Sequence, residues 1–322
     1  MYRLDSPFYP PISAPRTSGF LALDDIHTMY WEECGNPDGT PLVIPHGGPG
    51  GAVKAYYRTL ADPDFFRIIL YDQRGCGQST PAGELEQNTT RHLVEDLDTL
   101  RIHLGIEQWY VMGGSWSSTL SVAYAQSYPQ NVSGMVITGV MLGREADDWW
   151  WWEGARFVYP EIWETLRDFL PEAEQKDIKT AYLKRILDPD PDVHGPAAIA
   201  MLGWEIQTLD VWPDLEWVAD IHQSEDIVRS GRIFAHYAFN DFFLEKDQII
   251  KRMDRIQHIP AKIINGRFDM CTPPRTAWDL HKAWGISALE IVPCAGHRWN
   301  DPLLAAAVIR ATDALKRAPL DE

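Results

Sequence analysis

The segment VMGGSWSSTLSVAYAQ at residues 111–126 carries the strongest structural signal in this chain of 322 amino acids. A short apolar run ends in two glycines, Ser115 follows, and the next residues have helical apolar spacing. A strand that turns sharply through glycines into a helix exposes such a serine beside free backbone N–H groups. The pattern approaches G-x-S-x-G, with Ser117 in the last position. Ser115 is therefore either a nucleophile or a serine that caps a helix.

Apolar, β-rich runs recur on both sides of this segment, and helical stretches separate several of them. Near-continuous apolar runs of this kind are typical of strands buried on both faces of a parallel sheet. We predict strands at 41–45, 65–72, 108–113, 134–140, 261–266 and 289–293, helices at 90–104, 116–127 and 301–316, and an antiparallel pair within 19–35. For the first helix, Thr90 is a candidate cap and Gly105 a candidate stop. The alternation predicts an α/β fold, with helices on both faces of a mostly parallel sheet.

The pattern changes between residues 142 and 245. Strand signals vanish there, and the segment is helical, acidic and rich in tryptophan. A structureless loop of that length is rare inside a compact domain. We therefore predict a helical cap domain over 142–245, inserted into a core that consists of 1–141 and 246–322.

Composition and charge exclude several classes of partner. The chain is 45% hydrophobic and 23% charged, as in ordinary globular proteins, and its net charge is −17. That charge disfavours nucleic acids and anionic membranes. No apolar stretch has the length of a signal peptide or a membrane span, and the four cysteines are widely spaced. We expect a cytoplasmic protein; its oligomeric state is unknown.

Two further residues lie where a serine nucleophile would need partners. Asp269 follows the predicted strand 261–266, and His297 follows the last predicted strand in a glycine-flanked loop. In this type of fold the triad residues occur in the order Ser, Asp, His. Each residue alone is weak evidence, since loop aspartates are commonly turn residues and single histidines are commonly structural. Their joint order favours Ser115 as the nucleophile.

The glycine-rich turn PHGGPGG at 45–51 follows the first predicted parallel strand. A backbone N–H at Gly47 or Gly48, together with that of Trp116, would stabilise a tetrahedral oxyanion. The alternative is a simple tight turn, because no G-K-[ST] follows that would indicate phosphate binding. We expect His46 to brace this loop. We also expect Asp72 and Arg74 to fix the turn in YDQRGCGQS at 71–79.

Several segments resemble the proline iminopeptidases (prolyl aminopeptidases) of the α/β-hydrolase superfamily. They are HGGPGG at 46–51, DQRGCGQSTP at 72–81, the stretch 88–106, GGSWSSTLSVAYAQSYP at 113–129, GRFDMCTP at 266–273 and AGH at 295–297. The resemblance extends from about residue 5 to 317. It implies the α/β-hydrolase fold and a serine peptidase that releases an N-terminal proline from short peptides without a metal or an organic cofactor. It also implies Ser115 as nucleophile, Asp269 as orienting acid and His297 as base.

The resemblance is uneven in the residues that bind the substrate's free amine. LGWEIQTL keeps a Trp204–Glu205 pair, so Glu205 is the expected ligand of the ammonium. The family's second acid would stand where RIFAHY has Phe234, and we expect Phe234, Tyr237 and Trp204 to line the substrate pocket with Glu205. A buried ammonium needs paired negative charge, so another acid of the cap would have to compensate; the candidates are Asp148, Glu153 and Asp241.

The substrate therefore stays open between two readings. A compensating acid predicts a prolyl aminopeptidase, whereas a more apolar cap predicts an amidase or esterase for a bulkier or uncharged acyl group. The tryptophans fit both readings, because a flat apolar wall suits a pyrrolidine or an aromatic ring. Most of them are expected in the cap core, with one or two, such as Trp150, at the pocket. A non-catalytic binding protein is disfavoured, because Ser115, Asp269 and His297 are all present.

Overall fold

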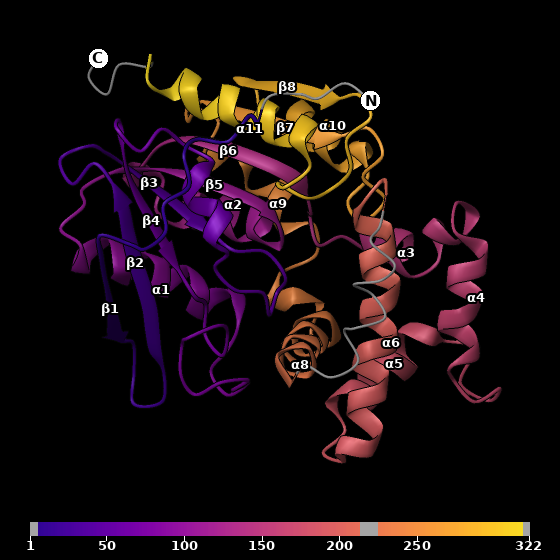
Figure 1. Ribbon diagram of the computed structural model, residues 1–322. Coiled ribbons are helices and arrows are strands. Elements are labelled where there is room, and N and C mark those ends of the chain that lie inside the picture. The colour runs from indigo at the N-terminus through magenta and orange to yellow at the C-terminus, as the bar shows by residue number, and fades with distance from the viewer. Residues whose placement is uncertain (1–5, 213–224, 318–322) are drawn as a thin grey trace.

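The computed structural model describes residues 6–212 and 225–317, and its central element is one eight-stranded sheet with the order β1-β2-β4-β3-β5-β6-β7-β8 (Figure 1). β1 and β2 pair antiparallel, β2 also pairs antiparallel with β4, and the remaining pairs are parallel. The strands are β1 (Thr17–Ala22), β2 (Thr28–Gly35), β3 (Thr40–Pro45), β4 (Phe66–Tyr71), β5 (Trp109–Ser115), β6 (Val132–Val140), β7 (Ala261–Gly266) and β8 (Ser287–Val292). The predicted α/β class with a mostly parallel sheet is confirmed.

The central strands are apolar on both faces because helices cover both faces. In β3, Val43 points into one core cluster, while Leu42 and Ile44 point into the other. The first cluster contains side chains from α1 (Thr90–His103), α2 (Trp116–Ser127) and α10 (Pro274–Ala283). The second contains side chains from α11 (Pro302–Leu315) and the short 3-10 helix η1 (Ala55–Thr59). This double covering explains the runs of consecutive apolar residues in the sequence.

The ends of α1 correct one prediction and agree with another. Thr89, not Thr90, is the N-cap, and its hydroxyl accepts a hydrogen bond from the His92 N–H. The Thr90 hydroxyl instead donates to the backbone carbonyl of Phe242. Gly105 follows the helix with a φ of +67°, a conformation that glycine adopts without the steric cost of a side chain.

A group of helices lies between β6 and β7 in the chain and to one side of the sheet in Figure 1. Large apolar side chains, including Trp152, Tyr182 and Trp204, are buried among these helices. The helices are α3 (Glu145–Trp152), α4 (Pro160–Asp168), α5 (Ile178–Leu187), α6 (Pro191–Leu209) and α8 (Glu225–Phe239), followed by α9 (Gln248–Lys251). Residues 213–224 of the predicted cap lie outside the described residues. The division into a core and a cap at 141/142 and 245/246 stays a prediction.

Helix α8 is attached to the loop before α1 by buried polar contacts. The Tyr237 hydroxyl donates to Asn88 Oδ1 at 2.8 Å, and His236 Nε2 donates to the Asn88 carbonyl at 2.8 Å. The Tyr237 ring also contacts the Trp116 ring edge-on, with 5.1 Å between their centroids. This part of the inserted segment is therefore packed directly on the first turn of α2.

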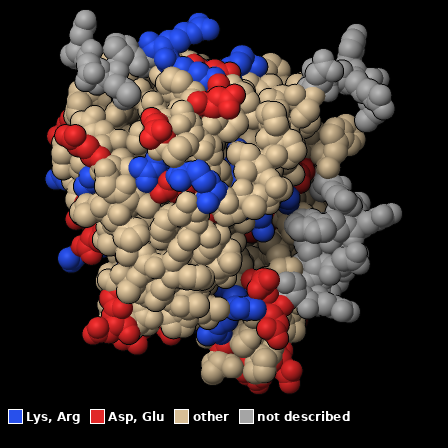
Figure 2. All heavy atoms as spheres, turned by 60° about the vertical axis from the view of Figure 1, so that its left-hand side comes forward, with Lys and Arg blue, Asp and Glu red and all other residues tan. Residues whose placement is uncertain are grey.

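Charged residues fix the turns around the sheet edge. Buried Arg74 forms a two-pronged ion pair with Asp96, a second ion pair with Asp24, and a hydrogen bond to the Gln87 carbonyl. On the face seen in Figure 2, Lys and Arg side chains are interspersed with Asp and Glu. Within 6–212 and 225–317, no helix combines the length and apolar character that a bilayer crossing requires.

Candidate active site

Ser115 lies at the junction of β5 and α2 in a strained backbone conformation. Its φ is +58° and its ψ is −133°, a region that residues other than glycine rarely occupy. Ser115 occupies the N-cap position of α2, but its side chain makes no capping hydrogen bond, so its hydroxyl does not serve to cap the helix. The strained turn instead presents the Ser115 side chain to the cavities described below.

Small residues beside Ser115 are required by close packing. A Cβ atom at Gly113 would lie 2.3 Å from the Ser117 carbonyl oxygen and 2.3 Å from Ser121 Oγ, which excludes any side chain there. Ser117 itself is fully buried, and its hydroxyl donates to the Gly114 carbonyl and accepts from the Gly114 N–H, each at 2.8 Å. The structure therefore accommodates Ser117 by giving its hydroxyl two backbone partners.

Asp269 and His297 lie in the loops after β7 and β8 and contact each other. His297 Nδ1 donates to Asp269 Oδ2 at 2.7 Å, and both side chains are buried. Thr272 holds the carboxylate from the other side, donating its N–H to Oδ1 at 2.7 Å and its hydroxyl to Oδ2 at 2.9 Å. Burial by itself would lower the pKa of His297, but the charge of Asp269 and its hydrogen bond raise it above the usual value.

The glycine-rich turn lies against Ser115. A Cβ atom at Gly47 would be 3.4 Å from Ser115 Cβ, and Gly48 has a φ of +124°. His46 is buried beneath this turn, where its Nε2 accepts from the Gln73 N–H at 3.0 Å. Its Nδ1 must therefore carry the proton, and it donates to the Gly47 carbonyl at 2.8 Å. Burial lowers the pKa of His46, which agrees with a neutral, bracing imidazole.

Gln73 connects the two sides of this turn, and the sequence patterns did not single it out. Its side-chain oxygen accepts from Trp116 Nε1 at 3.0 Å, and its side-chain nitrogen donates to the His46 carbonyl at 2.6 Å. Trp116, the first residue of α2, is thereby fixed relative to Gly47 and Gly48. The sequence indicates Gln73 only by its position in the segment DQRGCGQS, between the charged residues Asp72 and Arg74.

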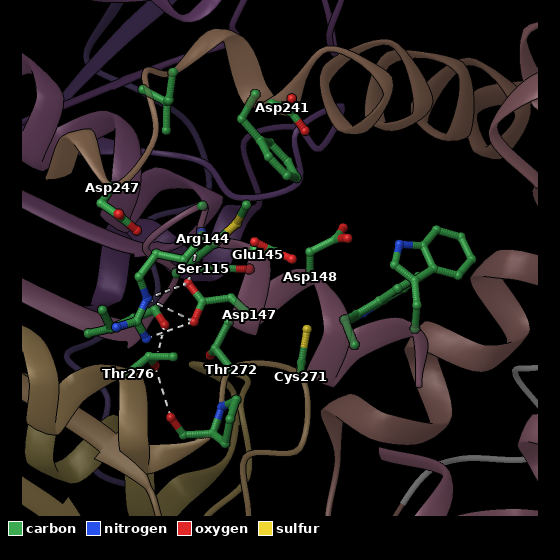
Figure 3. Close-up of a pocket in the computed structure, with 18 of the residues that line it drawn as sticks. Ser115, Arg144, Glu145, Asp147, Asp148, Asp241, Asp247, Cys271, Thr272 and Thr276 are labelled. Carbon is green, nitrogen blue, oxygen red and sulfur yellow. Dashed lines mark hydrogen bonds and ion pairs between the residues drawn. The ribbon is translucent and has the colours of Figure 1, made fainter. Parts of the chain in front are cut away.

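Two cavities meet at Ser115. The larger one, about 390 Å³ in volume, extends between the sheet and the helices inserted after β6 (Figure 3). The described residues around it include seven carboxylate side chains, namely Glu145, Asp147, Asp148, Glu205, Asp241, Glu245 and Asp247, and two basic ones, Arg144 and Lys246. The smaller cavity, about 180 Å³, is lined by His297, Gly47 and Gly48, together with residues after the glycine-rich turn. Ser115, Gly48 and Glu205 line both.

The residues expected to bind substrate do not all reach these cavities. Glu205 and Phe234 line the larger one, as expected for pocket residues. Trp204 and Tyr237 are instead buried, donating hydrogen bonds to the Trp151 carbonyl and to Asn88, and they are absent from the lining of both cavities.

Trp150 is also placed away from the cavity wall. Its Nε1 donates to the Met270 carbonyl at 2.8 Å, whereas the neighbouring Trp151 and Trp152 line the larger cavity. The Trp151 ring lies 5.6 Å from that of Phe234, centroid to centroid. The larger cavity therefore has an aromatic wall, but Trp151 and Trp152 form it instead of the predicted Trp150.

The three compensating acids suggested by the sequence differ in position. Asp148 and Asp241 line the larger cavity, and Figure 3 shows both on the same cavity as Ser115. Asp148 forms an ion pair with Lys179 at 2.8 Å, and its pKa is raised, mainly by burial. Glu153 instead pairs with Arg156 and does not line either cavity.

Comparison with a family model and with solved structures identifies the class of protein to which this fold belongs. A family model described as the alpha/beta hydrolase fold matches residues 40–298. A putative lipase from Acinetobacter baumannii has a TM-score of 0.64 at 14% identity, with 94% of this chain and 91% of that chain covered. A bromoperoxidase from Bacillus anthracis has a TM-score of 0.64 at 17% identity, covering 94% and 99%. The fold and the site thus define an α/β hydrolase.

Curated sequences narrow the class further. A proline iminopeptidase from Arabidopsis thaliana is 44% identical over 96% of this chain and 82% of its own length. A proline iminopeptidase from Xylella fastidiosa (strain Temecula1) is 41% identical over 95% of this chain and 98% of its own. This chain belongs to the proline iminopeptidase family of α/β hydrolases.

Proposed function

We propose that this protein is a serine aminopeptidase that releases an N-terminal proline from short peptides, with Ser115, His297 and Asp269 as its triad. The observation that carries the proposal is the buried Asp269–His297 hydrogen bond of 2.7 Å beside a cavity that also exposes the strained Ser115. The relatives named proline iminopeptidase supply the substrate class.

The proposed reaction begins with proton transfer. His297 takes the proton of the Ser115 hydroxyl as its oxygen attacks the carbonyl carbon of the N-terminal residue. The N–H groups of Trp116 and of Gly48 or Gly47 stabilise the oxyanion, a contribution of about 3–4 kcal/mol for each donor. His297 then protonates the leaving amine, and water hydrolyses the acyl-enzyme. Asp269 keeps the imidazole oriented and stabilises its charged form.

Glu205 is the proposed ligand of the substrate ammonium. It lines both cavities beside Ser115, which is where the amine of an N-terminal residue would lie if its carbonyl were under attack. Phe234 supplies no second carboxylate, so we assign the compensating negative charge to Asp148 and Asp241 in the wall of the same cavity. Paired carboxylates offset the cost of removing an ammonium from water.

A second candidate function is hydrolysis of an amide or ester whose acyl group is bulkier and uncharged. The aromatic wall of Trp151, Phe234 and Phe242 favours it, because the rings of Trp151 and Phe234 are 5.6 Å apart and those of Phe234 and Phe242 are 6.4 Å apart. Such a wall binds flat apolar groups without requiring a charge.

Labelling with a serine-directed fluorophosphonate tests the nucleophile. We expect the wild-type protein to be labelled, and the Ser115→Ala variant, folded by circular dichroism, to lose the label. Ser127→Ala is the matched control, since Ser127 is an exposed serine at the other end of α2 whose hydroxyl donates to the Ala123 carbonyl. Folded wild-type protein that takes up no label would reject the serine-hydrolase mechanism.

Hydrolysis of three model substrates separates the two candidate functions. A prolyl arylamide with a free amine should be hydrolysed, whereas its N-acetylated form and a simple aryl ester should be poor substrates. Equal or faster turnover of the acetylated amide or the ester would favour the second function. We further propose a cytoplasmic location, consistent with four free cysteines, and small peptides rather than nucleic acids or membranes as partners.

A further inference from the structure

The two cavities that meet at Ser115 differ in charge. The larger one is lined mainly by carboxylates, as described above. The smaller one is lined by Lys54 and Arg298, and the carboxylate that it shares with the larger one is Glu205. A substrate that spans Ser115 therefore meets negative charge on one side and positive charge on the other.

The position of His297 identifies which side receives the leaving group. In serine hydrolysis the general acid must lie next to the leaving nitrogen, because it donates the proton that releases that nitrogen. His297 lines the smaller cavity and is absent from the lining of the larger one. The leaving group of the peptide therefore lies in the smaller, basic cavity, and the N-terminal residue in the larger, acidic one.

Lys54 is the cation available in the smaller cavity. It follows the glycine-rich turn, its side chain is exposed, and it forms no ion pair with any residue of 6–212 and 225–317. Arg298 forms an ion pair with Asp210 at 3.0 Å, yet its charge still acts on both Glu205 and His297. Three aromatic side chains that meet edge to face, Tyr56, Tyr57 and Trp299, form the apolar part of this cavity.

We propose that the smaller cavity binds the free carboxylate of a one-residue leaving group at Lys54, so that the preferred substrate is a dipeptide with a free amino group and a free carboxylate. The inference rests on the aminopeptidase function proposed above. One residue spans at most about 3.6 Å along the chain, so the carboxylate of the second residue stays close to the scissile bond.

The test compares prolyl-alanine with prolyl-alaninamide, which differ only in the terminal carboxylate, and uses a prolyl arylamide as a third substrate. We expect wild-type kcat/KM to be about fivefold higher for the dipeptide than for its amide, as for a partly exposed ion pair, and to lose this preference in high salt. Lys54→Gln should abolish the preference, and Lys54→Glu should reverse it. Lys282→Gln, a substitution of an exposed lysine on α10, should retain it.

The outcomes distinguish this inference from the function on which it rests. If the arylamide is hydrolysed but the dipeptide and its amide are equivalent for the wild type, the carboxylate site is rejected and the aminopeptidase function stands. A dipeptide preference that survives in both Lys54→Gln and Lys54→Glu also rejects the site at Lys54. No turnover of any of the three substrates rejects the aminopeptidase function and, with it, this inference.

Discussion

The Ser117 hydroxyl is hydrogen-bonded twice to one residue, Gly114, accepting from its N–H and donating to its carbonyl, each at 2.8 Å. Gly114 is the last residue before the strained Ser115, at a shift in register between β5 and β6. The hydroxyl therefore ties the first turn of α2 to the end of β5, on both sides of the proposed nucleophile. A serine in place of glycine here adds two hydrogen bonds to the turn without crowding it.

Ser117→Ala should show this contribution. Removing the hydroxyl takes away a partner from two buried backbone groups, so we expect the free energy of unfolding to fall by about 1–3 kcal/mol. Ser127→Ala is the matched control, since Ser127 lies at the other end of α2 and donates only to the Ala123 carbonyl. Urea denaturation measures both. Equal midpoints for Ser117→Ala and the wild type would contradict the proposed role of the hydroxyl.

The pH dependence of kcat/KM should report the environment of His297. The base must be neutral to accept the Ser115 proton, and the charge of Asp269 raises the pKa of His297 against the effect of burial. Activity should therefore fall as the pH drops, with a midpoint above 6.5, the usual histidine value. In Asp269→Asn the opposing effect of burial remains, so the midpoint should move down while kcat falls by about 10³–10⁴-fold.

Asp168→Asn is the control for this profile, because Asp168 is an exposed residue at the end of α4. Its midpoint and kcat should equal those of the wild type. A wild-type midpoint at or below the usual histidine value would mean that Asp269 does not stabilise the imidazolium.

Glu205→Gln should lower activity and raise stability. Burial raises the pKa of Glu205, although the charges of His297 and Arg298 oppose the increase. When folding raises the pKa of an acid, ionising that acid costs more in the folded state than in the unfolded state. This penalty is absent below the ordinary glutamate pKa of 4.5, grows as the pH rises towards the raised pKa, and is complete above it. The variant should therefore unfold at higher urea concentration at pH 7, with a smaller difference at pH 5.

The loss of the carboxylate should reduce kcat/KM for the free-amine arylamide by about 10–100-fold, because the ammonium loses its charged partner. Glu290→Gln, at an exposed position on β8, serves as the control for both measurements. A Glu205→Gln variant that is less stable at pH 7, or equally active on the free amine, would remove Glu205 from the proposed role.

Phe234→Glu should increase selectivity for a free amine. The new carboxylate would lie in the wall of the larger cavity, beside Trp151, and would pair with the ammonium. The ratio of kcat/KM for the prolyl arylamide to that for its acetylated form should rise by about tenfold. Phe234→Gln has nearly the same shape without the charge, so its ratio should not rise. Equal ratios in the two variants would exclude a charge effect at this position.

The sequence predicts the sheet well because its signal is local. Buried parallel strands need consecutive apolar residues, and each predicted strand of the parallel part lies within two residues of the observed one, as 134–140 does against Val132–Val140. The positions of Asp269 and His297 can also be predicted from local sequence, because each residue follows a strand of the parallel sheet. The carboxyl ends of these two strands, β7 and β8, lie at the same edge of the sheet. The local pattern does not distinguish the two adjacent threonines at the start of α1, where Thr89 rather than Thr90 is the N-cap.

The pocket walls were less predictable because they depend on packing between distant segments. In the tryptophan run at 149–152, successive side chains point about 100° apart around a helix, so composition cannot tell which ones face the cavity. Trp151 and Trp152 do, whereas Trp150 reaches Met270. Gln73 was missed for a similar reason: its contacts with His46 and Trp116 join three segments that only folding brings together.

Helix α8 joins two parts of the molecule, because it packs against α5 and α6 of the inserted segment while His236 and Tyr237 donate hydrogen bonds to Asn88, in the loop before α1. Proteins open in cooperative units that follow packing rather than chain order. Backbone amides of α8 should therefore exchange with deuterium as slowly as those of α1, and more slowly than those of α4. Measured in this way, α8 would couple the opening of the inserted helices to the opening of the hydrolase core.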